Sequence, residues 1–145
     1  MTDDLTKQAA QAGLDSFMST FGRVPDQFRL LHQFAPSAFA GYGLMRSGLM
    51  RGKDEGGALD MKTKEFVFAL LDVLAGNTSG AKNHAQAAMK HGLTLPELAE
   101  GLVQVIMVGG ITTWNLGGAE VLRACAGMEE VTQPVVEREG PRGGG

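Results

Sequence analysis

The sequence of 145 residues predicts an all-α bundle of about six or seven helices. Prolines number only five, and the alternating runs of β-branched residues that are typical of strands are almost absent. Eight methionines suit an adaptable helical core or a self-association surface. A chain of this length can bury the core of one domain, so we expect a single domain over residues 1–128.

Three helices are predicted before residue 51. Asp3 or Asp4 can cap the first, which reaches about residue 20. Pro25 suits the first position of a short second helix, and Pro36 opens a third helix that continues to about residue 50. In the first helix, the residues expected to face the core are Leu5, Leu14, Phe17 and Met18.

A fourth helix is predicted over residues 61–75, after a polar, glycine-containing loop at residues 51–58. Asp60 is a good N-cap for this helix. From residue 66 to residue 75 only Asp72 is polar, and a helix that is apolar on nearly all sides is typically central. We therefore expect this helix to lie at the centre of the bundle.

Turn and capping signals divide the rest of the chain into three more helices. Residues 76–80 form a turn, and the fifth helix then continues to about His91 and ends at Gly92. Thr94 and Glu97 form a capping box that opens a sixth helix through about residue 108. Two glycines break the chain before a seventh helix at residues 112–126, and residues 129–145 are predicted to be a disordered tail.

Composition excludes several classes of function. The net charge is −3 and the basic residues are scattered, which argues against nucleic-acid binding. No apolar run approaches the roughly 20 residues that span a bilayer, and the polar N-terminus does not resemble a signal peptide. The single cysteine, Cys125, excludes an intrachain disulfide. We therefore expect a cytoplasmic protein without a membrane or nucleic-acid partner.

The strongest candidate site is the pair Glu65 and His84. Glu65 lies in an otherwise apolar helix, on the face that also carries Ala69 and Asp72, and burying a carboxylate there costs free energy unless a partner is provided. A neutral histidine beside a glutamic acid of raised pKa would form a proton-transfer pair. Gly80 lies one turn before His84 and, having no side chain, leaves room for a ligand beside the imidazole.

A structural role is an open alternative for both residues, as a helix-end ion pair or as a surface carboxylate near a satisfied histidine. The other histidines, His32 and His91, have weaker functional patterns. No HxxxH or HxH spacing and no cysteine pair accompanies any of them, so no metal site is expected.

Several segments resemble the carboxymuconolactone decarboxylase family, which includes the alkylhydroperoxidase D-like proteins. The resemblance covers about residues 21–126. It rests on the Leu-Asp-x-Lys-x-Lys-Glu segment that ends at Glu65, on His84, on the His-Gly-x-Thr-x-x-Glu stretch of residues 91–97, and on Val-Gly-Gly at residues 108–110. It implies an alkylhydroperoxidase D-like helical bundle and a homo-oligomer, commonly a trimer or hexamer.

The peroxidase branch of that family resembles this chain in spacing but differs in chemistry. Its two cysteine positions fall on Asn77 and Gly80, neither of which can replace a thiol. The decarboxylase branch also lacks those cysteines. That closer resemblance implies a lyase, without metal or organic cofactor, that decarboxylates a small carboxylated lactone such as 4-carboxymuconolactone in aromatic-compound degradation.

For this reaction His84 is expected to be the acid or donor, and Glu65 to orient it or share its proton. Expected substrate-binding residues are Asn77, Gly80, Lys62 and Trp114; further cations that could attract a carboxylate are Lys64, Arg46 and Arg51. Two alternatives stay open. One is an alkylhydroperoxidase-like antioxidant protein, and the other is a non-catalytic homologue that binds a small molecule.

Overall fold

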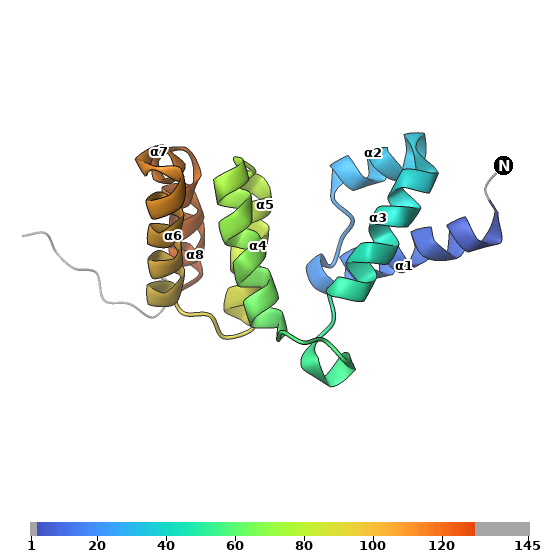
Figure 1. Cartoon of the computed structure of the whole chain (residues 1–145), viewed down its shortest axis with the longest axis horizontal. Helices are drawn as coiled ribbons and strands as arrows, with labels where there is room; N and C mark the ends of the chain where they lie inside the picture. The colour runs from blue at the N-terminus through green and yellow to red at the C-terminus, as the bar shows by residue number, and fades with distance from the viewer. Residues whose placement is uncertain (1–2, 130–145) are drawn as a thin grey trace, which may run out of the picture.

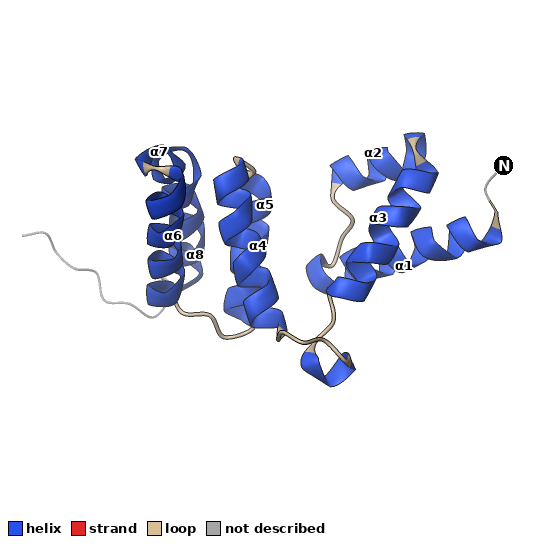
Figure 2. Cartoon of the chain, in the orientation of Figure 1, coloured by secondary structure: helices blue, strands red, loops and turns tan. Residues whose placement is uncertain are grey.

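The computed structural model describes residues 3–129, in which every regular element is a helix (Figures 1 and 2). An all-α fold is therefore confirmed. The elements are α1 (Asp4–Phe21), α2 (Asp26–Phe34), α3 (Pro36–Leu49), η1 (Lys53–Glu55), α4 (Met61–Ala75), α5 (Thr78–Lys90), α6 (Leu95–Gly109), α7 (Ile111–Thr113), η2 (Trp114–Gly118) and α8 (Ala119–Glu129). Residues 130–145 of the predicted tail lie outside the described residues.

Side-chain caps begin the helices at the predicted residues. Asp3 Oδ1 accepts the N–H of Thr6 at 2.7 Å at the start of α1. Asp60 makes the equivalent bond at the start of α4. Thr94 and Glu97 exchange side-chain and backbone hydrogen bonds ahead of α6, so the capping box is confirmed. These local bonds satisfy N–H groups that have no partner within the helix.

Two boundaries differ from the prediction. The fifth helix begins at Thr78, inside the predicted turn, because Asn77 caps it by accepting the N–H of Gly80 at 3.1 Å. The predicted seventh helix is divided into α7, the π-helical η2 and α8. Two buried glycines, Gly117 and Gly118, lie in η2 and weaken the regular α-helical geometry there.

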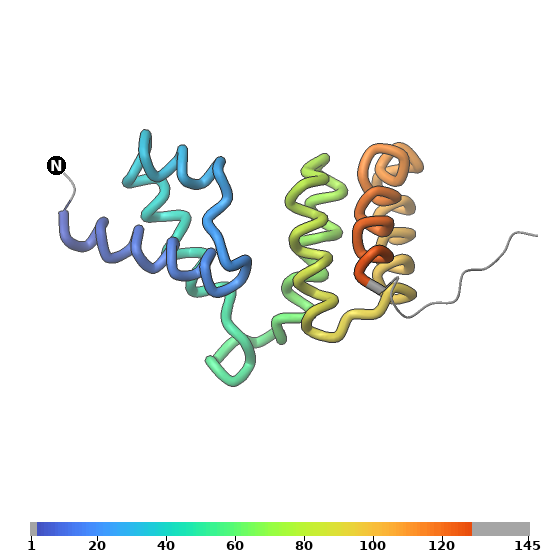
Figure 3. The backbone as a smooth tube through the Cα atoms, turned by 180° about the vertical axis from the view of Figure 1, so that it is seen from behind, coloured from blue at the N-terminus to red at the C-terminus, as the bar shows by residue number. Residues whose placement is uncertain are grey.

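The helices form two groups, α1–α3 and α4–α8, which lie side by side in opposite views (Figures 1 and 3). In the first group α3 packs on α1 and α2, and in the second α4 and α6 pack with α5 and α8. Each group has its own buried cluster. The first contains Ala10, Phe17, Phe39 and Ala40, and the second contains Ala69, Val73, Ala81, Ala85, Ala88, Leu93, Leu98, Leu102, Val105, Val121 and Cys125.

The segment that joins the two groups is fastened to α4 by a buried lysine. Lys64 Nζ donates to the carbonyl oxygens of Leu49 at 2.6 Å and Arg51 at 2.7 Å. Because these carbonyls belong to the last residue of α3 and to the segment just after it, charge-assisted bonds hold the end of the first group against the start of the second.

Some predicted core positions are wrong. Leu5 and Met18 of α1 are 75% and 52% exposed, whereas Phe17 is buried. The expectation that α4 is central is also wrong for one of its faces, since Val67 and Leu71 are exposed. In both helices there are more apolar residues than neighbouring helices can cover. Sequence periodicity does not indicate which of these residues are covered.

Gly13 of α1 and Gly43 of α3 allow the closest backbone approach in the first group. A Cβ atom built on Gly13 would lie 2.6 Å from the Cα of Gly43. We predict that Gly13→Ala lowers the free energy of unfolding in urea by about 1–3 kcal/mol, because α1 and α3 must separate. The control is Gly41→Ala, which meets no atom within 4 Å and should raise it by about 0.5–1 kcal/mol. Equal effects of the two variants would contradict this account of the contact.

Candidate functional site

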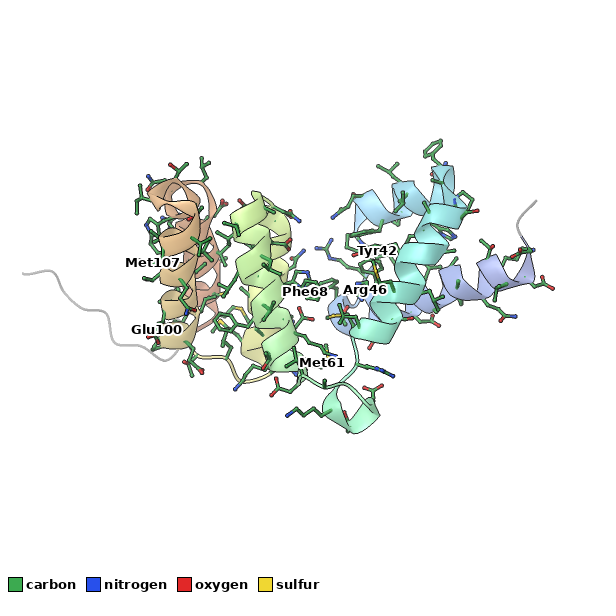
Figure 4. The ribbon with its side chains drawn as sticks, viewed as in Figure 1. Tyr42, Arg46, Met61, Phe68, Glu100 and Met107 are labelled. Carbon is green, nitrogen blue, oxygen red and sulfur yellow. The ribbon has the colours of Figure 1, made fainter. Side chains whose placement is uncertain are left out.

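A pocket of about 370 Å³ lies between the two groups of helices. Figure 4 shows Tyr42 and Arg46 of α3 on one side of the gap and Phe68 of α4 on the other. The wall from the first group consists of Phe17, Phe21, Pro25, Gln27, Phe28, Tyr42, Arg46 and Met50; the opposite wall consists of Phe68, Asp72, Asn77, Gly80, Asn83 and His84. Aromatic rings therefore surround a small number of polar groups, as is typical of a small-molecule site.

Glu65 and His84 are in direct contact, and of the two His84 lines this pocket. His84 Nδ1 lies 2.6 Å from Glu65 Oε2, and the Glu65 side chain is 1% exposed while that of His84 is 16% exposed. A buried carboxylate needs a hydrogen-bond donor, and the Nδ1–H of His84 supplies it. With Nδ1 used in this way, Nε2 is the ring nitrogen left free for other chemistry.

Two aromatic side chains hold the imidazole of His84 in place. Phe68 of α4 stacks on it, with ring centroids 4.8 Å apart and an interplanar angle of 23°. Phe21 of α1 contacts it edge-on at 5.5 Å and 62°. The ring is thus fixed by the carboxylate at one edge and by phenyl groups from both groups of helices.

Asp72 lies on the other side of the imidazole. Its Oδ2 is 3.9 Å from His84 Nε2, and its side chain is 24% exposed. Burial raises the pKa of Asp72, an effect larger than the lowering by the charge of His84 and by a hydrogen bond from Asn77. Asp72 is two helical turns from Glu65, and this spacing on one face was the sequence signal for its presence here.

Arg46 is the buried cation of the pocket. It is 6% exposed and donates to Ser16 Oγ at 2.5 Å and Thr20 Oγ1 at 2.8 Å, and its guanidinium lies 4.1 Å from the centroid of the Phe17 ring. Burial lowers its pKa from the usual value, but an arginine stays charged in proteins. Among residues 3–129 no carboxylate lies within 4.0 Å of it, so its charge is available to an anion in the pocket.

Asn77 and Gly80 both line the pocket, next to Asp72. A Cβ atom built on Gly80 would lie 2.5 Å from Asn77 Nδ2 and 2.6 Å from Asp72 Oδ2. The space beside Gly80 that the sequence suggests for a ligand therefore receives these two side chains. The ligand-binding roles of Asn77 and Gly80 stay predictions.

Lys62 and Trp114 do not line this pocket. Hydrogen bonds from the backbone N–H groups of Thr63 and Thr94 are the main reason that the pKa values of Asp60 and Glu97 are lowered, and the charge of Lys62 adds to both effects near the starts of α4 and α6. Trp114 packs half-buried against the cluster of the second group. Of the further cations, Lys64 binds backbone carbonyls and Arg51 is exposed. The roles of Lys62 and Trp114 in substrate binding stay predictions.

Cys125 is fully buried in α8, and burial raises its pKa to about 11. A thiol with such a pKa is almost entirely protonated at neutral pH, which disfavours its use as a nucleophile. Over residues 3–129, no group of three or more histidine, cysteine and acidic side chains is arranged to hold a metal ion. Within the same range, none of the helices combines the length and apolar character needed to cross a membrane.

Neither a protein-family model nor a curated protein matches the sequence. One solved structure does match, the crystal structure of a "putative carboxymuconolactone decarboxylase" from Burkholderia xenovorans LB400. The TM-score is 0.79 and the sequence identity is 27%, over 87% of this chain and 95% of that chain. The similarity extends over nearly all of both chains, in fold as well as in sequence, and it supports the predicted resemblance to the carboxymuconolactone decarboxylase family.

Proposed function

We propose that this protein is a cofactor-independent lyase that decarboxylates a small carboxylated lactone similar to 4-carboxymuconolactone. The observation that carries the proposal is the 2.6 Å contact between His84 and the buried Glu65, at a pocket that also contains the buried Arg46. Similarity to a protein named as a decarboxylase supports the same class of reaction.

In the proposed reaction, the bond between the leaving carboxylate and the ring carbon breaks, and carbon dioxide departs. The electron pair moves into the conjugated lactone as an enolate, which must then receive a proton at carbon. His84 in its charged form donates this proton from Nε2, and Glu65 stabilises that form through Nδ1. Neutral His84 then regains a proton from water at the pocket mouth.

Arg46 is proposed to bind an acidic group that the substrate keeps throughout the reaction. Its buried guanidinium would pair with a carboxylate, and the ring would lie among the phenyl groups of Phe21, Phe28 and Phe68. This arrangement leaves the reacting carbon next to His84, on the opposite wall.

The alkylhydroperoxidase-like alternative has weaker support, because the positions of the thiol pair are Asn77 and Gly80 and because Cys125 is buried. A non-catalytic binding protein would use the same pocket without proton transfer. In that case a ligand would raise the melting temperature while no turnover occurred. A cytoplasmic location stays a prediction from the sequence.

We predict that His84→Ala lowers kcat for 4-carboxymuconolactone by about 10²–10⁴-fold, the usual contribution of a positioned acid. Glu65→Gln should lower it by up to about 10⁴-fold, because an amide can hold the imidazole in the wrong tautomer. Turnover can be followed by the release of carbon dioxide. The control is His91→Ala, which changes an exposed histidine outside the pocket. Full turnover by folded His84→Ala would refute the proposed mechanism.

Replacement of Arg46 tests the anion site. Arg46→Met should raise KM by about 10- to 100-fold, because an ionic hydrogen bond contributes about 1.5–3 kcal/mol. Arg46→Lys keeps the charge but not the planar fork, so its KM should be intermediate. Arg46→Lys also keeps a cation near Ser16 and Thr20, so it can still be tested if Arg46→Met does not fold. If KM is unchanged in both Arg46→Lys and folded Arg46→Met, the acidic group of the substrate binds elsewhere. The control is Arg123→Met, which changes an exposed arginine of α8.

We also propose that the chain forms a homo-oligomer, a trimer or hexamer. Three exposed apolar residues of α4, Val67, Leu71 and Leu74, are spaced as one helical face, and Met107 of α6 is 81% exposed. Exposed apolar patches of this kind are typical of protein interfaces.

We predict that Leu71→Glu and Met107→Glu lower the molar mass measured by size-exclusion chromatography with light scattering, because each places a charge in an apolar contact. Leu5→Glu, at an exposed position of α1, is the matched control and should keep the wild-type mass. A monomeric wild type would refute the oligomer, and an unchanged mass in both α4 and α6 variants would exclude these faces.

A further inference from the structure

We propose that Asp72 is a second catalytic acid of this site, whose carboxylic O–H donates a hydrogen bond to the enolate oxygen while His84 protonates the carbon. This inference rests on the proposed function and adds a residue to it. The sequence pattern places Asp72 on the same helical face as Glu65 without assigning it a role.

The geometry places two polar atoms around one point of the pocket. Asp72 Oδ2 and His84 Nε2 are 3.9 Å apart, too far for a hydrogen bond between them. A substrate group between them can lie at hydrogen-bond distance from both. Glu65 has no such access, because its side chain is 1% exposed and contacts the other nitrogen of the imidazole.

The position of Asp72 in the pocket wall, beside the imidazole, shifts its carboxyl group toward the protonated form. Burial is the largest influence on Asp72 and raises its pKa. Of the charged and titratable groups around it, His84 of α5 acts in the opposite direction. Glu65 lies on the same helix, and Arg46 and Tyr42 of α3 line the opposite wall. A carboxylic acid in a partly apolar site can act as a hydrogen-bond donor to an enolate.

The proposed step is balanced when one proton is taken up from solvent. When carbon dioxide leaves, the electron pair of the broken bond moves onto the lactone carbonyl oxygen, where the Asp72 O–H stabilises it. The pair then returns to carbon as His84 gives up the proton on Nε2. Asp72 keeps its own proton, and water restores the proton of His84.

A structural role for Asp72 has to be distinguished from this one. Asp72 receives a hydrogen bond from Asn77, the N-cap of α5, and its backbone carbonyl accepts the N–H of Asn77 at 2.8 Å. A residue that only supports this cap would affect stability. Replacing such a residue would not change how many groups must be protonated for activity, which the slope of log kcat/KM against pH measures.

The test is the pH dependence of kcat/KM for 4-carboxymuconolactone in the wild type, Asp72→Asn and Asp72→Ala. In the wild type both Asp72 and His84 must be protonated, so log kcat/KM should fall with a slope of two at high pH. Asp72→Asn retains a donor that does not titrate, and its slope should be one. Its kcat should stay within about 10-fold of the wild type, whereas Asp72→Ala should lose about 10²–10³-fold, as when an oxyanion donor is removed.

Asp60→Asn is the matched control. It makes the same change at the N-cap of α4, the helix that contains Asp72, but at a position outside the pocket. Its slope should remain two. A slope of two in Asp72→Asn, or an Asp72→Asn variant as inactive as Asp72→Ala, would overturn the role of Asp72 while leaving the proposed lyase intact. Absence of turnover by the wild type would instead overturn the proposed function, and the role of Asp72 with it.

Discussion

The contact between Glu65 and His84 is the interaction on which the site depends. A carboxylate that is 1% exposed has lost its water, and the hydrogen bond from the imidazole replaces that hydration. The bond joins α4 to α5, so the packing of these helices and the orientation of the ring are set together. Phe68 and Phe21 then restrict the remaining rotation of the ring. A residue that would be mobile on a surface is thereby held in one orientation.

The division of the chain into two groups of helices explains why both walls of the pocket carry polar side chains beside aromatic rings. Each group buries its own apolar cluster, which leaves the surfaces between the groups free to carry charged residues. Arg46 comes from one group, and Asp72 and His84 come from the other. A ligand with an acidic end and a polar reacting end would therefore contact both groups, and its binding energy would hold them together.

Local signals predicted much of this fold, because the bonds that begin the helices are local. Asp60 and the Thr94–Glu97 box act through hydrogen bonds within three residues, and the sequence contains all that is needed to recognise them. The exposure of Leu5 and Met18 depends instead on which helix lies opposite, and one sequence does not contain that information. For the same reason Lys62 was a reasonable candidate that the fold does not bring to the pocket.

The candidate site was predictable to a similar extent. A carboxylate in an apolar helix indicates by itself that a partner must exist, and His84 was identified as that partner. Asp72 shares a face with Glu65, but whether it lies in the pocket depends on the angle at which α5 crosses α4. Arg46 could not be separated from Arg51 by sequence, because both are cations near the end of α3. Only tertiary packing buries one guanidinium and leaves the other in solvent.

The residues that replace the thiol pair of the peroxidase branch also indicate what chemistry remains. Asn77 caps α5, and Gly80 allows the Asn77 amide and the Asp72 carboxyl group to approach the backbone at that point. A side chain at residue 80 would displace both groups, so the glycine and the position of Asp72 depend on each other. The described residues thus place carboxyl groups on two sides of an imidazole where a redox site would need sulfur. With Cys125 buried in the cluster of the second group, that arrangement favours the movement of protons over the transfer of electrons.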